Sequence, residues 1–321
     1  MKALTPLRGV AAMTVLLFHA GLPIKGYLCV DLFFILSGFV LMHAYGQMAV
    51  SGRAYFSFLK ARLARIYPVH LLVLVMLLPM LGTPGFGAIG LIHSLLLTQS
   101  PWYTNCWNFA SWSISAEWHA YLAFPFLAVA IRARSKPALV LILIGCGVVV
   151  SAAMLVKGTA NVTYTPAVFL RLFAEFVAGM VLYRLRGELA GSARNFAWFG
   201  VAAAIVAAQI FALPDAVTIC LLPGLLIYAT KEDGAFYRIL NLAPLRYLGE
   251  ISYSLYMVHM VVVVVAYRLL PPLGLIEHWA LFVLGPVALA IPVSLFVEMP
   301  ARQYFRQLKL PSLQPIPVPA A

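Results

Sequence analysis

Residues 7–21 read LRGVAAMTVLLFHAG, an apolar segment with an arginine near one end and a histidine near the other. Arg8 and His19 are eleven residues apart, which makes nearly three full helical turns, so both side chains lie on one face. At about 1.5 Å per residue they are roughly 16 Å apart along the axis. Ionisable side chains are costly in a bilayer and mark function there. A base and a fixed cation in one span therefore indicate a reaction centre linked to a site for an anionic ligand.

The rest of the chain has the composition of a membrane protein. Of its 321 residues, 63% are hydrophobic and only 10% are charged, and the mean hydropathy is +0.95. Apolar runs of about 20 residues match the length that crosses a bilayer. The sequence therefore predicts an all-α, polytopic membrane helix bundle with about ten transmembrane helices. These lie near residues 4–21, 28–46, 66–82, 113–131, 138–156, 166–185, 195–212, 216–230, 247–270 and 278–298.

One further apolar segment, FGAIGLIHSLLLTQ at 86–99, is short for a span, and we expect a re-entrant or interfacial helix. The basic segments favour this count, because ten spans put all of them on one side. By the positive-inside rule that side is the cytoplasm, with both termini. The basic segments are 52–65, 132–136, 184–194, 231–246 and 302–309. We assign residues 1–306 to one membrane domain and 307–321 to a Pro-rich cytoplasmic tail.

Charge and cysteine usage exclude other classes. The net charge of +12 is distributed over short loops between apolar runs, which argues against a nucleic-acid partner. Neither the four cysteines nor the seven histidines have metal-ligand spacing, so we expect no metal. The first apolar run has no clear small-x-small cleavage site, and we interpret it as a span and not as a cleaved signal peptide.

Two of the carboxylates in the predicted spans, Asp31 and Glu117, are candidates for the chemistry. Asp31 lies near the same end of its span as His19, and the connecting loop is short, so we expect them to be neighbours. A carboxylate that accepts from one imidazole nitrogen makes the other a better base. The alternative is that Asp31 caps or anchors a helix. Glu117 lies four or five residues into its span and needs a cation, a hydrogen-bond network or a proton there.

Arginines form a second pattern. Arg62 and Arg65 are three residues apart, on one helical face, and arginine forks suit phosphate. The alternative is a topology signal combined with contact to anionic lipids. Arg171 and Glu175 lie one turn apart, which favours a structural ion pair.

Three further sets of residues concern helix contacts. Pro68 is expected to start or kink the span that follows the arginines. Ser37 and Gly38 are expected to serve helix packing. Ser252, Tyr256 and His259 align along one face, which can line a polar cavity.

Taken together, these residues resemble the membrane-bound acyltransferase family 3, over roughly residues 4–306. Arg8 and His19, with ten residues between them, are the first mark of the resemblance. The others are VDLFFILSGF at 30–39, FLKARLARIYP at 58–68, WSISAEW at 112–118, FAEFVAGMVLYRLR at 173–186, LGEISYSLYMVH at 248–259 and VEMPAR at 297–302. Members of this family O-acylate glycans, peptidoglycan, lipids and macrolides.

The resemblance implies roles for the matched positions. His19 is similar to the catalytic histidine, and Arg8 to its partner in the signature motif. Arg62 and Arg65 resemble the basic residues proposed to meet acyl-CoA, and Glu117 resembles an essential acid. With Arg8 as a further contact to the phosphates, this implies a donor site for acyl-CoA, with acetyl-CoA as the expected donor and no metal.

The expected function is an O-acyltransferase of the bacterial cytoplasmic (inner) membrane. It would move an acyl group to a hydroxyl of a glycan, a lipid-linked glycan or a similar acceptor, surrounded by membrane lipids. His19 would act as general base or take the acyl group itself, oriented by Asp31 or Glu117. The alternative classes are a transporter that uses intramembrane charges and a structural or lipid-scrambling protein. The sequence has no visible inverted repeat, which counts against a transporter.

Overall fold

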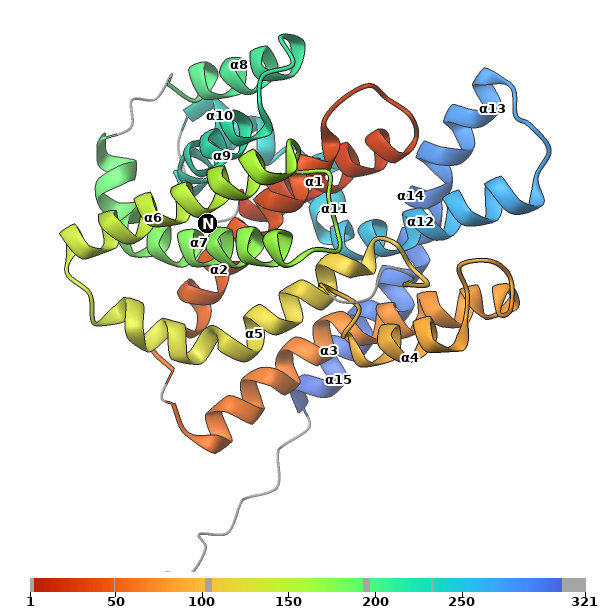
Figure 1. Ribbon diagram of the computed structural model, residues 1–321, viewed down its shortest axis with the longest axis horizontal. Helices are drawn as coiled ribbons and strands as arrows, with labels where there is room; N and C mark the ends of the chain where they lie inside the picture. The colour runs from red at the N-terminus through yellow and green to blue at the C-terminus, as the bar shows by residue number, and fades with distance from the viewer. Residues whose placement is uncertain (1–2, 49, 102–105, 193–196, 232–233, 308–321) are drawn as a thin grey trace, which may run out of the picture.

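The computed structural model describes residues 3–48, 50–101, 106–192, 197–231 and 234–307, and these residues form an all-α bundle (Figure 1). The helices have the following bounds: α1 Leu4–His19, α2 Cys29–Tyr45, α3 Gly52–Leu77, α4 Ala88–Leu96, α5 Ser111–Arg132, α6 Lys136–Lys157, α7 Pro166–Ser192, α8 Ala197–Ile210, α9 Asp215–Thr230, α10 Gly234–Leu240, α11 Ala243–Glu250, α12 Ser252–Leu269, α13 Leu275–Trp279, α14 Gly285–Val293 and α15 Met299–Gln307. Two π-helical turns, Ala280–Leu284 and Ser294–Glu298, join α13, α14 and α15 into one continuous helical segment.

The helix lengths confirm the predicted class of fold. Within the described residues, seven helical segments are long and apolar enough to cross a membrane, and three shorter apolar helices accompany them. These ten segments coincide with the ten predicted spans. The predicted short helix is α4, which has nine residues and is too short to cross a bilayer.

The structure differs from the prediction at two boundaries. The basic segment 52–65 is helical and continuous with the next span, so Pro68 lies inside α3 and does not start a helix. Ser51 caps α3 by accepting a hydrogen bond from the backbone N–H of Ala54. The predicted span 247–270 is divided at Ile251 into α11 and α12. Most of the predicted tail, residues 308–321, lies outside the described residues.

The tightest helix crossing in this arrangement joins α2 to α7. A Cβ on Gly38 would lie 1.9 Å from the carbonyl oxygen of Phe176, and one on Gly179 would lie 1.9 Å from that of Ile35. Backbones can approach this closely only where both helices carry glycine. The packing role predicted for Gly38 agrees with this contact. The crossing also fixes the rotation of α2, and this decides which of its side chains face the interior.

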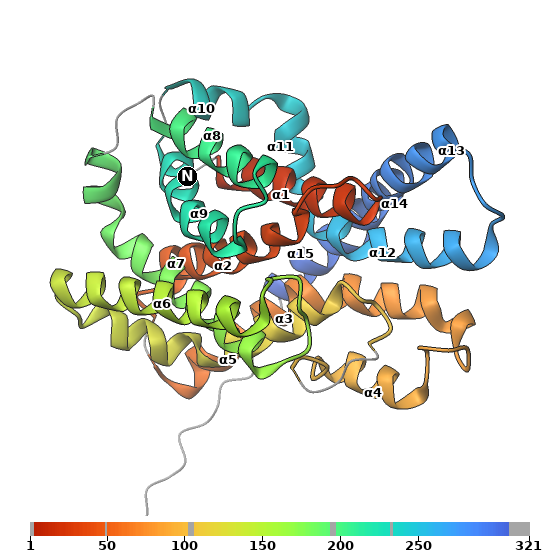
Figure 2. The same ribbon diagram turned by 45° about the horizontal axis from the view of Figure 1, so that its top comes forward.

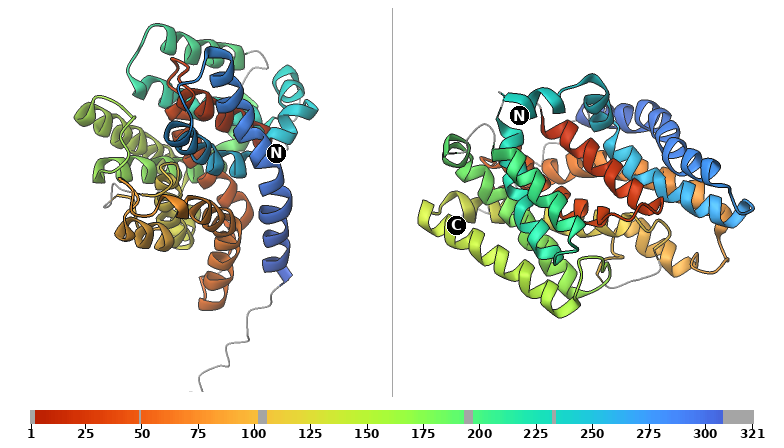
Figure 3. Two further views of the ribbon diagram at one scale, coloured as in Figure 1. Left: turned by 90° about the vertical axis from the view of Figure 1, so that its right-hand side faces the viewer. Right: turned by 90° about the horizontal axis from the view of Figure 1, so that it is seen from above.

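The other helices surround α2 on its open side. α1 packs beside α2, α11 and α12, while α3 packs against α5, α12 and α15. Figure 2 shows α8 to α11 grouped beside α1, with α3, α4 and α5 across the molecule from them. In Figure 3, α15 runs beside α3 at the end of the bundle from which the chain leaves. α1, α2, α3, α5 and α12 therefore converge on one interior region.

Candidate active site

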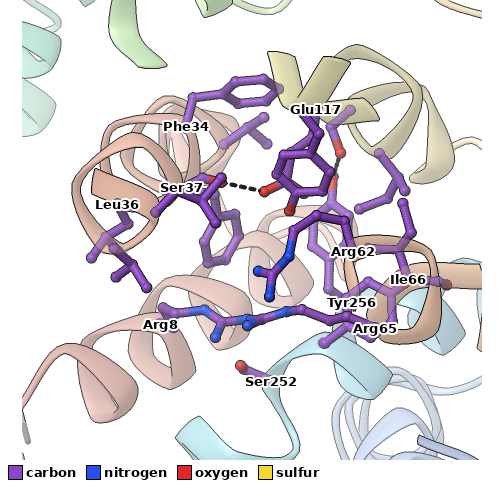
Figure 4. Close-up of a pocket in the computed structure, with 18 residues that line it drawn as sticks. Arg8, Phe34, Leu36, Ser37, Arg62, Arg65, Ile66, Glu117, Ser252 and Tyr256 are labelled. Carbon is purple, nitrogen blue, oxygen red and sulfur yellow. Dashed lines mark hydrogen bonds between the residues drawn. The ribbon is translucent and has the colours of Figure 1, made fainter. Parts of the chain in front are cut away.

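A cavity of about 90 Å³, here called the central cavity, lies among α1, α2, α3, α5 and α12. Most of its wall is apolar, but polar and charged side chains reach it from all five helices. They are Arg8, Ser37, Arg62, Arg65, Ser113, Glu117, Tyr121, Ser252, Tyr253 and Tyr256. Figure 4 shows Arg8, Arg62 and Arg65 extending their guanidinium groups into the same space, with Glu117 across from them.

The central cavity is lined by more positive than negative side chains. Its lining residues include three arginines and one carboxylate, Glu117. Arg8 is attracted by the charges of Glu117 and Glu298 and repelled by that of Arg65. Guanidinium groups gathered in a half-buried space repel one another, and an anion placed among them relieves this repulsion. The cavity thus has the charge that suits an anionic ligand.

Glu117 is held by a hydrogen bond that the sequence analysis did not anticipate. Its Oε1 accepts a hydrogen bond from Ser37 Oγ at 2.6 Å. We expected Ser37 to serve helix packing, but its hydroxyl faces the cavity. Ser113, one turn before Glu117, is bonded to Tyr256 instead, with 2.8 Å between the two hydroxyl oxygens. The sequence feature that could have indicated this orientation is the spacing of seven residues between Val30 and Ser37, which places both on the same face of α2.

A larger cavity of about 300 Å³, here called the Arg302 cavity, adjoins the central cavity and shares Val40, Leu41, Arg62 and Arg65 with it. Arg302 and Phe305 of α15 line its other side. The sequence did not predict Arg302 as a site residue, because nothing in the VEMPAR segment indicates that α15 packs beside α3.

Within the Arg302 cavity, Tyr45 holds Arg62. The guanidinium of Arg62 donates to Tyr45 Oη at 3.1 Å. It also lies over the Tyr45 ring, 5.1 Å from the centroid. An aromatic ring under a guanidinium fixes the plane of its nitrogen donors. The arrangement therefore keeps Arg62 in place at the junction of the two cavities.

A third cavity of about 30 Å³, here called the His19 cavity, lies at the other end of α1. His19 Nδ1 is 3.0 Å from the backbone carbonyl oxygen of Val15. A carbonyl oxygen only accepts hydrogen bonds, so Nδ1 carries the proton and Nε2 has a free lone pair. Nε2 is thus the atom of His19 that can accept a proton or attack a carbonyl.

The three cavities adjoin one another in order. The His19 cavity shares Val30 and Tyr256 with the central cavity, which in turn shares four residues with the Arg302 cavity. Arg8 lines the central cavity and His19 lines the next one. The two residues of α1 therefore line adjoining cavities, Arg8 the one with the arginine cluster and His19 the one with the histidine.

The structure does not bring Asp31 to His19. Asp31 is fully buried, and its Oδ1 lies 3.1 Å from Nε of Arg171. Arg171 also contacts Glu175 at 3.7 Å, so the predicted ion pair is present but shared with Asp31. The reason is the rotation of α2: Asp31 follows Val30 by one residue, about 100° around the helix, and faces α7. This geometry matches the anchoring alternative.

Cys106 lies behind the His19 cavity, and its Sγ is 2.5 Å from Tyr164 Oη. The Tyr164 ring in turn contacts Phe109, which lines the cavity. Burial raises the pKa of the Cys106 thiol to about 11. The thiol is therefore protonated near neutral pH and is a poor nucleophile. Of the two side chains, His19 is the better candidate for chemistry.

Comparisons with known proteins identify the family of the chain. The acyltransferase 3 family model, described as an acyltransferase domain, matches residues 2–297. "Acyltransferase MdmB" of Streptomyces mycarofaciens is 29% identical over 305 residues, which cover 83% of this chain and 76% of that protein. "Protein 2 in picA locus" of Rhizobium radiobacter is 37% identical over 139 residues, which cover 36% of this chain and 72% of that protein. No solved structure matches the chain. Because the family model spans most of its length, the chain belongs to the acyltransferase 3 family of membrane acyltransferases.

Proposed function

We propose that this membrane acyltransferase moves an acyl group, with acetyl as the expected group, from acyl-CoA to a hydroxyl of a glycan, a lipid-linked glycan or a similar acceptor. The observation that carries the proposal is the order of the three adjoining cavities. A wide space lined by arginines adjoins the central cavity, and the central cavity adjoins a narrow space lined by a histidine whose Nε2 is available. A long donor with phosphates at one end and a thioester at the other fits that order.

The phosphates of CoA would bind at the junction of the Arg302 cavity and the central cavity. Arg62 and Arg65 line both spaces, Arg302 lines the wider one, and Arg8 lies deeper. Guanidinium groups bind phosphate through two parallel hydrogen bonds, which gives orientation as well as affinity. The wide cavity would admit the nucleotide end, and the narrower central cavity the pantetheine arm.

Glu117 has a different part in this proposal from the one expected. It lies among the arginines and accepts from Ser37, on the donor side of the junction with the His19 cavity. We therefore assign it to ordering the arginine cluster and limiting its positive charge, and not to orienting His19.

His19 would perform the chemistry at the far end of the donor. Its Nε2 either removes the proton of the acceptor hydroxyl or attacks the thioester carbonyl and carries the acyl group. The apolar and aromatic wall of the small His19 cavity would exclude water, which limits hydrolysis of the thioester. Both routes use the same atom.

Orientation follows from the donor, because acyl-CoA is cytoplasmic. The arginine end would face the cytoplasm and the His19 end the far side of the bacterial inner membrane. Both chain termini would then be cytoplasmic, as the basic segments indicate. Acceptor chemistry would take place at the far side of the membrane or close to it.

The test is a transfer assay with purified protein in lipid nanodiscs. Radiolabelled acetyl-CoA is mixed with a panel of hydroxyl acceptors that contains a monosaccharide, a bacterial polysaccharide and a macrolide. We expect label in one acceptor and an equal amount of free CoA thiol, and neither with His19→Ala. Absence of transferred label across the panel, in protein that still binds CoA, would contradict the proposal. A transporter would move a panel member across a vesicle membrane unchanged.

A further inference from the structure

A second histidine lies against His19. His259 is on α12, which packs along α1, and the ring centroids of His19 and His259 are 5.0 Å apart with planes tilted by 44°. His259 is only 2% exposed. Tyr256, one turn earlier on α12, closes the other side with its ring centroid 5.7 Å away. The two imidazoles thus form a contacting pair, of which His19 lines the His19 cavity.

Backbone carbonyls fix the same tautomer in both rings. His19 Nδ1 is 3.0 Å from the oxygen of Val15, and His259 Nδ1 is 2.6 Å from the oxygen of Tyr256. Because carbonyl oxygens only accept, each Nδ1 carries a hydrogen. Each Nε2 therefore presents a lone pair.

The Nε2 of His259 has no hydrogen-bond partner among the described residues, although it is buried. A buried acceptor without a donor destabilises a fold, and such atoms call for an explanation. In the resting enzyme neither Nε2 can satisfy the other, since both are acceptors. One added proton would satisfy both, as an N–H donor on one ring and an acceptor on the other.

The surroundings of His19 make such a partner useful. An imidazolium that forms in an apolar space needs stabilisation, which a carboxylate commonly supplies. Asp31 does not supply it, because its carboxylate is bound to Arg171. Glu117 is bonded to Ser37 in the central cavity. Among these side chains, His259 is the one whose ring contacts the His19 ring, and its Nε2 is a buried acceptor without a partner among the described residues.

We propose that His259 is a positioning residue for His19, with its Nε2 sharing the proton that His19 Nε2 takes from the acceptor hydroxyl. This inference rests on the proposed function and on the route in which His19 is the general base. The hydroxyl oxygen bonds to the thioester carbonyl carbon as its proton moves to His19. The proton stays between the two Nε2 atoms during the tetrahedral intermediate. When the C–S bond breaks, the proton goes to the CoA sulfur, which leaves an ester, free CoA and two neutral imidazoles.

Two amide substitutions separate this role from a structural one. In His259→Gln, the longer side chain brings an acceptor oxygen to about the position of Nε2. In His259→Asn, the amide nitrogen replaces Nδ1 and keeps the bond to Tyr256, but nothing replaces Nε2. Turnover and KM are measured for both variants with acetyl-CoA and the best acceptor of the panel, together with melting temperatures in the same nanodiscs.

We expect His259→Asn to lose about 10²-fold or more in kcat, which is the usual contribution of a proton-transfer partner. His259→Gln should recover a tenfold or larger part of that loss, with KM for acetyl-CoA unchanged in both. The melting temperatures should follow the opposite order. Activity that follows melting temperature, with Asn better than Gln, would overturn the inference and make His259 structural. A wild-type enzyme that is active while both variants match it would also overturn it and leave the proposed function intact. A wild-type protein without transfer activity would remove both.

Discussion

The two ends of the series of cavities differ in size, charge and exposure. At one end, the Arg302 cavity measures about 300 Å³, and the arginines at its junction with the central cavity are half-buried. At the other end, the His19 cavity measures about 30 Å³. There the one arginine in the wall, Arg171, is fully buried and already paired with Asp31.

In the proposed function, this difference assigns recognition of the donor and chemistry to separate places. Half-buried guanidinium groups keep part of their hydration, so a phosphate can bind without a large desolvation cost. Proton transfer needs the opposite surroundings, because hydrogen bonds are stronger where water is excluded. The eleven residues from Arg8 to His19 keep the two apart by roughly 16 Å. Substitutions at one end should therefore change binding, and those at the other end should change turnover.

The largest effect is expected at the His19 end. His19→Ala removes the atom that accepts the proton or the acyl group, so transfer of labelled acetyl should fall by about 10²- to 10⁴-fold. The affinity for CoA, measured by calorimetry on the same nanodiscs, should match wild type because the arginines are untouched. Transfer at the wild-type rate would remove His19 from the chemistry.

The arginine end should show the reverse pattern. The double variant Arg62→Ala with Arg65→Ala loses two charged forks and should raise KM for acetyl-CoA by about 10²-fold, with kcat at saturation little changed. A matched control is Arg53→Ala with Lys60→Ala, on the same helix but in the wall of none of the three cavities. Equal KM values for the two double variants would mean that Arg62 and Arg65 act only as topology signals.

Glu117→Gln tests whether the arginine end and the His19 end act separately, because this carboxylate lies between them. The amide can still accept from Ser37, but the central cavity loses its negative charge among three arginines. We expect CoA to bind several-fold more tightly and turnover to fall about tenfold, as product release slows. If Glu117 instead orients His19, kcat should collapse while the calorimetric Kd for CoA stays at the wild-type value.

The smallest effect should come from Ser37→Ala. It removes one hydrogen bond to a charged group, which is worth about 1.5–3 kcal/mol where no other donor replaces it. Because Glu117 also faces Arg8, we expect a replacement and a change below about tenfold in kcat/KM. A loss as large as that of His19→Ala would show that Ser37 takes part in the reaction itself.

Periodicity and composition were enough to predict the membrane spans and the shared orientation of some side chains. Apolar runs of about 20 residues predicted the spans, and the face shared by Arg62 and Arg65 predicted that both side chains reach the same cavities. The position of Asp31 could not be predicted, because the crossing at Gly38 and Gly179 rotates α2. One residue along α2 corresponds to about 100° of rotation. This is the difference between Val30, which lines the central cavity, and Asp31, which faces α7.

The contributions of Arg302 and His259 depend on long-range packing. Arg302 comes to the site because α15 packs beside α3, and His259 because α12 packs beside α1. The alignment of Ser252, Tyr256 and His259 along one face predicted a polar wall, and the structure puts Ser252 and Tyr256 in the central cavity. Nothing in the sequence indicated that His19 would be the neighbour of His259.

In the proposed function, the arginine end and the His19 end are joined where the central cavity adjoins the His19 cavity. Val30 lines both, so Val30→Phe should narrow the junction without touching an ionisable group. The matched control is Val10→Phe, on the exposed side of α1 and in the wall of none of the three cavities. The decisive measurement is acetyl transfer by both variants in protein whose CoA affinity is known. We expect wild-type CoA affinity in both variants and loss of transfer in Val30→Phe alone. Wild-type transfer by Val30→Phe would contradict this expectation.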